Sequence, residues 1–157
     1  MTRDEVLQDL RERFGEDILG FTDKSPSRVY IEIKPESIVR MGTYLFRNLG
    51  ARFNIASGTD MPPVIEILYH FIIEDINLIV SLRVKLDREN PEIASLAKDI
   101  EAFNWIEREI SELLGVTFIG HPDPRRLLLA DNWPECVYPL RQDYEEWDET
   151  ADRTRGV

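Results

Sequence analysis

The stretch that decides the fold is VIEILYHFIIEDINLIVSLRVKL, residues 64–86. In its second half, every other residue is Leu or Val, and the residues between them are mixed apolar and polar. This period of two is typical of a half-buried antiparallel strand, with one face in the core and the other toward water. Two such runs therefore flank the short EDIN segment, residues 74–77. The buried set of the second run is expected to be Leu78, Val80, Leu82, Val84 and Leu86.

Upstream of this hairpin the pattern predicts two helices and two strands. Apolar residues recur every four positions across residues 2–14, which indicates a helix that Gly15 ends. The segments DILGF (17–21) and RVYIEIK (28–34) are predicted strands. Pro35 is suited to the first turn of a second helix, whose buried stripe would be Ile38, Met41, Leu45 and Leu49.

Downstream of that second helix, residues 51–63 are expected to form a short strand that breaks into a loop. After the hairpin, DRENPEIAS (87–95) is expected to be a loop that leads to a helical region near 94–114. This order of elements predicts an α+β fold: a single antiparallel sheet with helices packed on one face. We expect a compact domain over residues 1–118, followed by an extended C-terminal arm over residues 119–157.

The arm combines prolines with large apolar side chains. Four prolines between residues 122 and 139 leave little room for helix or strand, yet the segment also holds Trp133, Trp147, Tyr138 and three consecutive leucines. Disordered tails are normally poor in such residues. The arm is therefore expected to lie against its own domain or against a partner protein.

Composition excludes several functions. A net charge of −11 repels phosphate backbones and anionic lipid head groups, so we expect no nucleic-acid partner and no direct membrane contact. Structural zinc sites and iron–sulfur clusters usually take four Cys or His ligands. The chain has only His70, His121 and Cys136, so we expect no cofactor and no metal here; the role of Cys136 stays unassigned. The apolar stretch 65–86 is broken by charges and predicts no membrane span.

The segment NWIEREISELLG (104–115) predicts the last helix, with Asn104 as its cap and Glu107 as the acid of a capping box. Arg108 and Glu112, four residues apart, can pair. Glu107 and Glu109 could form a general acid/base pair. However, side chains two apart on a helix point about 200° apart, so we favour a structural or interface role for both.

His121 and three arginines give the alternative hypothesis. His121 could be a general base or a metal ligand, although a histidine in Gly-His-Pro more often fixes a loop. Arg125, Arg126 and Arg141 could clamp a phosphate or carboxylate, or they could pair with nearby aspartates or with a partner's acids. On this reading the chain is a stand-alone small enzyme or an anion-binding regulator.

The spacing of the charged residues carries a resemblance. Glu107-Arg108-Glu109, Glu112 and Leu113-Leu114 are followed by His121, by RRLLL (125–129) and by PLRQDY (139–144). This order closely resembles the signature of the 30-kilodalton subunit family of respiratory complex I (NADH:quinone oxidoreductase). The same subunit type occurs in energy-converting membrane-bound hydrogenases.

The resemblance implies a non-catalytic subunit of the hydrophilic arm of a membrane-associated redox complex. Such a protein docks against the large catalytic subunit, beside iron–sulfur subunits. Iron–sulfur clusters, flavin or nickel–iron would sit only on partner chains. The implied location is cytoplasmic, at the inner face of the membrane through the complex, and an isolated chain could self-associate. The implied interface residues are Glu107, Arg108, Glu109, His121, Pro122, Arg125, Arg126, Trp133, Tyr138, Pro139, Leu140 and Arg141.

Three departures bear on the parent complex. Complex I members commonly carry Leu at the position of Pro124 and Lys at the position of Gln142. Between Trp133 and PLR (139–141) they have a shorter segment than the PECVY (134–138) of this chain. The longer segment of this chain is more similar to that of the hydrogenase branch of the family. Whether the parent complex reduces quinone or evolves hydrogen stays open. Truncation after Leu114 is expected to leave a folded domain that no longer joins the complex.

Overall fold

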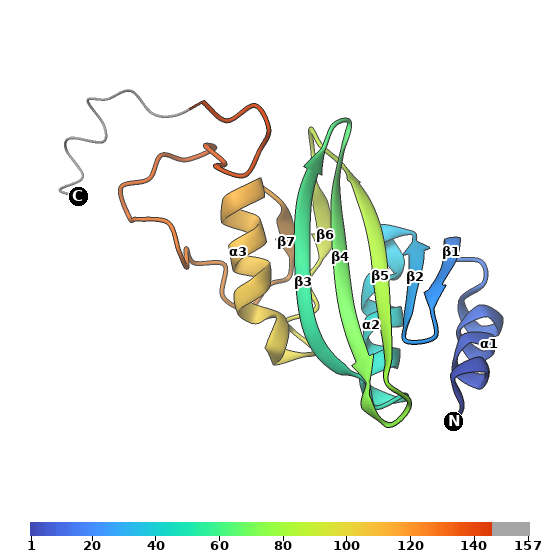
Figure 1. Cartoon of the computed structure of the whole chain (residues 1–157). Coiled ribbons are helices and arrows are strands. Elements are labelled where there is room, and N and C mark those ends of the chain that lie inside the picture. The colour runs from blue at the N-terminus through green and yellow to red at the C-terminus, as the bar shows by residue number, and fades with distance from the viewer. Residues whose placement is uncertain (146–157) are drawn as a thin grey trace.

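The computed structural model describes residues 1–145 of the chain. Figure 1 shows a central twisted sheet with helices against it and a long C-terminal segment running beyond the last helix. The helices and strands, in chain order, are α1 (Arg3–Phe14), β1 (Ile18–Ser25), β2 (Arg28–Ile33), η1 (Pro35–Ser37), α2 (Ile38–Arg47), β3 (Arg52–Met61), β4 (Val64–Ile73), η2 (Glu74–Ile76), β5 (Leu78–Asp87), β6 (Glu92–Ala94), η3 (Glu101–Phe103), α3 (Asn104–Leu114) and β7 (Thr117–Ile119).

The hairpin expected from residues 64–86 forms the middle of the sheet. β4 and β5 pair antiparallel along their whole length, and their alternate Leu, Ile, Val, Tyr and Phe side chains are buried. The strand order is β1-β2-β5-β4-β3, so β3 and β1 are the two edges. Asn77 makes the tight turn between β4 and β5 with a left-handed φ of 48°, a conformation that Asn tolerates better than most residues.

The α+β class is confirmed, and two details of the prediction are corrected. β2 and β5 run parallel, so the sheet is mixed; α2 and the β3–β4 hairpin lie between them in sequence and supply the long connection that a parallel pair needs. Residues 52–61 form a full strand of 10 residues, although a short strand was predicted. Pairing with β4 holds this strand despite its Asn, Ser and Gly residues, which have low strand propensity.

All three α-helices cover the same face of the sheet, as predicted. The ring of Phe103, just before α3, packs against Tyr69 and Phe71 of β4, with centroids 5.9 and 5.7 Å apart. Phe14 of α1 meets Tyr44 of α2 edge-on at 5.4 Å. The opposite face carries a mixture of polar and apolar side chains. His70 lies there, and its Nδ1 is 2.7 Å from the Ser81 hydroxyl.

The residues before α3 and after it form a second, smaller sheet. β6 and β7 pair parallel, which places a strand inside the segment predicted to be a loop. The buried side chains of Val116 and Phe118 join the main core from this sheet. Within residues 1–145, no helix has the length and hydropathy needed to cross a membrane.

Candidate partner interface

Helix α3 is fixed to the body through a buried carboxylate. Glu107 has no exposed surface; it accepts hydrogen bonds from the Ser95 hydroxyl and, at 2.7 Å, from the Leu96 amide. Burial raises the pKa of Glu107 to about 7, and these hydrogen bonds lower it only in part. The predicted capping box is therefore wrong. The turn of η3 already holds Asn104 in helical conformation, so the N-cap is Phe103 and no side chain caps it.

Glu107 and Glu109 face different surroundings, as their spacing on a helix requires. Glu107 points into the core, whereas Glu109 is partly exposed and lines a groove beside β3. The two carboxylates do not meet at one site, and this geometry does not support a general acid/base pair.

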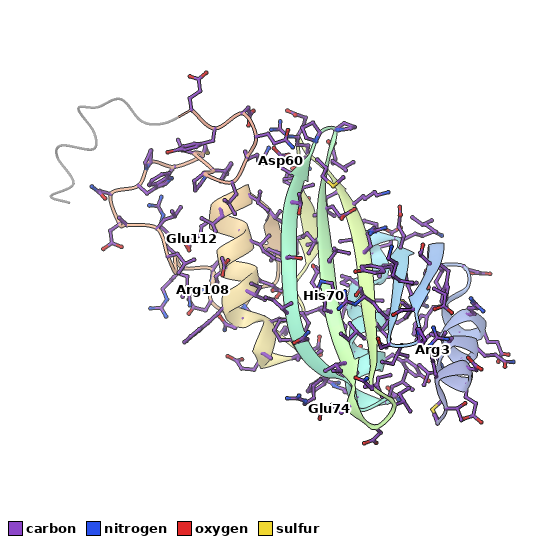
Figure 2. The ribbon with its side chains drawn as sticks, in the orientation of Figure 1. Arg3, Asp60, His70, Glu74, Arg108 and Glu112 are labelled. Atoms are coloured by element: carbon purple, nitrogen blue, oxygen red, sulfur yellow. The ribbon has the colours of Figure 1, made fainter. Side chains whose placement is uncertain are left out.

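Arg108 and Glu112 do not pair with each other, contrary to the prediction; both project toward the C-terminal segment (Figure 2). The Arg108 guanidinium donates to the carbonyl oxygens of Arg125 and Arg126, at 2.7 and 2.8 Å. The Glu112 carboxylate accepts from three successive backbone amides, at positions 127, 128 and 129. One turn of α3 thus binds backbone groups of five consecutive residues, 125–129, through two ionised side chains. Hydrogen bonds to ionised groups are stronger than those between neutral groups.

His121 fixes the beginning of the arm. Its Nε2 lies 3.0 Å from the carbonyl oxygen of Asn104, and its Nδ1 accepts from the Asp123 amide at 3.0 Å. This pattern selects the neutral tautomer with the proton on Nε2. Glu107 lies 3.8 Å from the same Nε2. Both ring nitrogens are engaged in hydrogen bonds, so the ring is not available as a general base. Its contacts are those of a histidine that fixes a loop.

The three arginines proposed as an anion clamp do not converge. Arg125 is bound by Asp123 through two hydrogen bonds, which lower the pKa of that carboxyl. Arg126 closes a turn by donating to the carbonyls of Ala130 and Trp133. Arg141 donates to the carbonyl of Leu114 at 2.7 Å and stabilises the C-terminal end of α3.

A second anchor of the arm was not found from the sequence. Asp60 is buried near the end of β3. Its carboxylate accepts a bidentate pair of hydrogen bonds from the Arg88 guanidinium, at 2.7 and 2.9 Å. The same carboxylate accepts from the Gln142 amide, and the Gln142 side chain donates to the Asp60 carbonyl, both at 2.8 Å. Arg88 lowers the pKa of Asp60. The signal available was a single acid near the end of a strand whose only other charged residue is Arg52, and this signal is weak.

The arm between Gly120 and Glu145 holds its backbone against α3 and leaves its apolar side chains accessible. Every residue in this range is at least partly exposed. The Leu128 side chain is 60% exposed and that of Leu140 is 56% exposed. The Trp133 indole donates to the Val137 carbonyl at 2.8 Å and stacks on Tyr144. Trp147 lies outside the described residues. Anchoring by polar contacts thus leaves an apolar outer surface, which is typical of protein–protein contact sites.

All of the predicted interface residues therefore lie on two adjacent segments, α3 and the arm. Cys136 is exposed and has a left-handed φ of 62°. No group of three or more His, Cys, Asp or Glu side chains between residues 1 and 145 is arranged to hold a metal ion.

Comparison with known proteins agrees with this architecture. Residues 31–150 match the family described as respiratory-chain NADH dehydrogenase, 30 Kd subunit. The chain belongs to this 30 Kd subunit family. The resemblance drawn from the residues between Glu107 and Tyr144 is thereby confirmed.

Relatives of this 30 Kd family member come from two kinds of complex. The C/D subunit of the NADH-quinone oxidoreductase of Proteus mirabilis (strain HI4320) is 28% identical over 90% of this chain. Formate hydrogenlyase subunit 5 of Escherichia coli (strain K12) is 28% identical over 87% of it. The chain spans 25% of the length of each of these curated relatives.

The fold is also similar to that of a chain in the membrane-bound sulfane sulfur reductase, an archaeal respiratory membrane complex. That chain has a TM-score of 0.78 at 15% identity, with 98% of this chain and 91% of that chain covered. At this level of identity, the match shows that the fold is shared.

Proposed function

We propose that the chain is a non-catalytic subunit of a membrane-associated redox complex of the NADH:quinone oxidoreductase or energy-converting hydrogenase type. Helix α3 and the arm dock it against the large catalytic subunit and the neighbouring iron–sulfur subunits, which supports assembly and electron transfer. The observation that carries this proposal is the arm. Its backbone is fixed by Arg108 and Glu112, while Leu128 and Leu140 remain more than half exposed.

The relatives support the same reading. This chain corresponds to a quarter of the C/D protein and of formate hydrogenlyase subunit 5, so in those proteins the equivalent domain is attached to a much larger remainder. The proposed partner of this chain is the counterpart of that remainder. Iron–sulfur clusters, flavin or nickel–iron are proposed to lie on the partner chains, and the complex holds this chain at the cytoplasmic face of the membrane.

The interface is proposed to be centred on the large side chains of the arm. Aromatic residues and Arg dominate the energetics of most interfaces, and Trp133, Tyr138 and Arg141 lie on the arm beside the two exposed leucines. Of the remaining motif residues, His121 and Arg108 act by holding the arm in place, and Glu107 acts by fixing α3 to the body. A stand-alone enzyme or an anion-binding regulator has less support, because His121 and the arginines are engaged within the chain.

Affinity purification from native cells in mild detergent tests the proposal. The full chain is expected to co-purify with a large redox subunit and its iron–sulfur partners. A chain ending at Pro124, which keeps the hydrogen bonds of His121, is expected to fold and to lose these companions. If the shortened chain retained them at full yield, the arm would not be the docking element.

A further inference from the structure

We infer that the free edge of β3, together with the neighbouring groove of α3, receives an extended strand of the partner subunit, which adds to the sheet. This inference rests on the proposed function and names the chemistry of one part of the interface. β3 is the last strand of the five-stranded sheet, and within residues 1–145 β4 is its only neighbour in that sheet. The outward N–H and C=O groups of an edge strand are a ready template for another strand.

Two of the devices that normally block such pairing, charge and proline, are missing from residues 53–59, which read FNIASGT. The strand has a register shift between Phe53 and Ile55, so the regular edge available for pairing is residues 55–59. Within residues 1–145 these seven residues make no side-chain hydrogen bond, and their backbone pairs only with β4. The stretch between Arg52 and Asp60 therefore presents no charge that a docking strand would have to remove from water.

A groove beside this edge can take the side chains of the added strand. It has a volume of about 250 Å³ and lies between residues 55–58 of β3 and the face of α3 formed by Ile106, Ile110 and Leu113. Leu140 of the arm is also among the residues that line it. The absence of a side chain at Gly58 lets Leu114 pack directly on β3, because a Cβ there would lie 2.5 Å from the Leu114 side chain. The groove is therefore continuous with Leu140, one of the exposed leucines of the arm.

The groove also specifies a charge on its occupant. Among the described residues, Glu109 is the only charged one that lines it, and within that part of the chain Glu109 has no ion-pair partner. One turn earlier on the same helix, Trp105 is 70% exposed. Trp105 and Glu109 are four residues apart on α3, so the indole and the carboxylate can together bind one lysine or arginine side chain. The occupant is thus an extended segment with apolar side chains on the groove side and a basic residue opposite Glu109.

A second copy of this chain fits the groove less well. Its own β3 would bring no cation within residues 53–59, so Glu109 would stay unpaired. Arg52, at the start of that strand, is already engaged by Glu74. These features favour a partner of different sequence over self-pairing through the same edge.

Hydrogen–deuterium exchange of the native complex tests the inference. The backbone amides of residues 55–59 that point outward are expected to exchange at least about tenfold more slowly in the complex than in the isolated chain. Assembly of the complex with unchanged exchange at these amides would overturn strand addition and leave the proposed function intact. Slow exchange in a dimer of the isolated chain would assign the edge to a second copy and would also overturn it.

Reversing the charge of Glu109 provides a second, independent experiment. Glu109→Lys is expected to reduce incorporation into the complex by at least about tenfold, because it replaces an attraction with a repulsion. Glu16→Lys is the matched control, since Glu16 is exposed beside β1, the opposite edge of the sheet. Equal incorporation of both variants would contradict the role of Glu109. A wild-type chain that enters no larger complex would contradict the proposed function, and this inference with it.

Discussion

Single residues of α3 determine whether the arm stays in place. Arg108 and Glu112 bind main-chain groups, not side chains, so their contacts depend little on which residues occupy positions 125–129. An isolated surface ion pair between them would contribute about 0.3–0.5 kcal/mol. Hydrogen bonds to charged groups contribute about 1.5–3 kcal/mol each. The observed arrangement therefore stabilises the molecule more than the predicted pair would.

The first residue-scale prediction concerns Glu112. Glu112→Ala removes the acceptor of three successive amides, so we expect the amides of Leu127, Leu128 and Leu129 to exchange at least about tenfold faster. The measurement is hydrogen exchange of the isolated chain. Arg125→Ala is the control, since that side chain is 80% exposed and its one ion-pair partner within residues 1–145 is Asp123. Unchanged exchange in Glu112→Ala would show that the arm is held by other contacts.

The second residue-scale prediction concerns the pH dependence of stability. The pKa of Glu107 is raised from 4.5 to about 7 by burial, so between these values the folded chain binds more protons than the unfolded chain. The free energy of unfolding therefore falls with rising pH across this window, by on the order of 3 kcal/mol from this group. Glu107→Gln should remove that contribution and gain stability relative to wild type from pH 5 to pH 8.

Denaturant unfolding of both proteins at the two pH values measures this difference. If the free energies of unfolding of the wild type and of Glu107→Gln changed in parallel with pH, the raised pKa of Glu107 would be contradicted. Titrating groups distant from Glu107 affect both proteins equally and cancel in the comparison.

At the scale of elements, the ion pair between the buried Asp60 and the partly buried Arg88 joins the end of the β3–β4 hairpin to the arm. Breaking a buried pair typically costs 3–5 kcal/mol. Because Arg88 keeps Asp143 as a partner, we expect Asp60→Ala to lower the free energy of unfolding by roughly 3 kcal/mol. Glu32→Ala, which removes the more exposed pair with Lys85, should cost less than about 1 kcal/mol. Equal losses in denaturant titrations of the two variants would contradict this ranking.

The structure also moves the boundary at which the chain can be cut. Val116 is buried, and Phe118 is only 8% exposed, so both belong to the core although they follow Leu114. Loss of a buried Phe costs about 3–5 kcal/mol. A chain ending at Leu114 should therefore be destabilised by at least about 3 kcal/mol, whereas one ending at Pro124 should melt cooperatively. Thermal denaturation followed by circular dichroism distinguishes them, and equal melting temperatures would contradict this boundary.

The same elements show what sequence patterns can and cannot predict. The alternation in residues 78–86 identified β5 and its buried face, because side-chain period depends only on local geometry. It carried no information on strand direction, so the parallel pairing of β2 with β5 was missed. The partners of Arg108, Glu112 and Asp60 were missed for a related reason. They include backbone groups of the distant arm, and backbone groups leave no signature in the sequence.

At the scale of the whole molecule, the body and the arm are stabilised differently. The body has a continuous apolar core beneath the sheet, and the segment from Gly120 to Glu145 contributes no buried residue to it. Figure 1 shows this segment running along α3 on the side away from the sheet. A segment rich in Leu, Trp and Tyr gains most of its hydrophobic stabilisation only when a partner covers it. On this division of roles rests the proposal that the arm is a preformed surface for the large subunit.

Site-specific photo-cross-linking in native cells tests that claim most directly. A photoreactive phenylalanine analogue replaces Leu128, whose side chain is 60% exposed on the arm, and in a control chain it replaces Glu16. We expect the Leu128 probe to cross-link to one larger redox subunit and the Glu16 probe not to do so. Cross-links from Leu128 that reach only this chain, or no protein at all, would contradict the account.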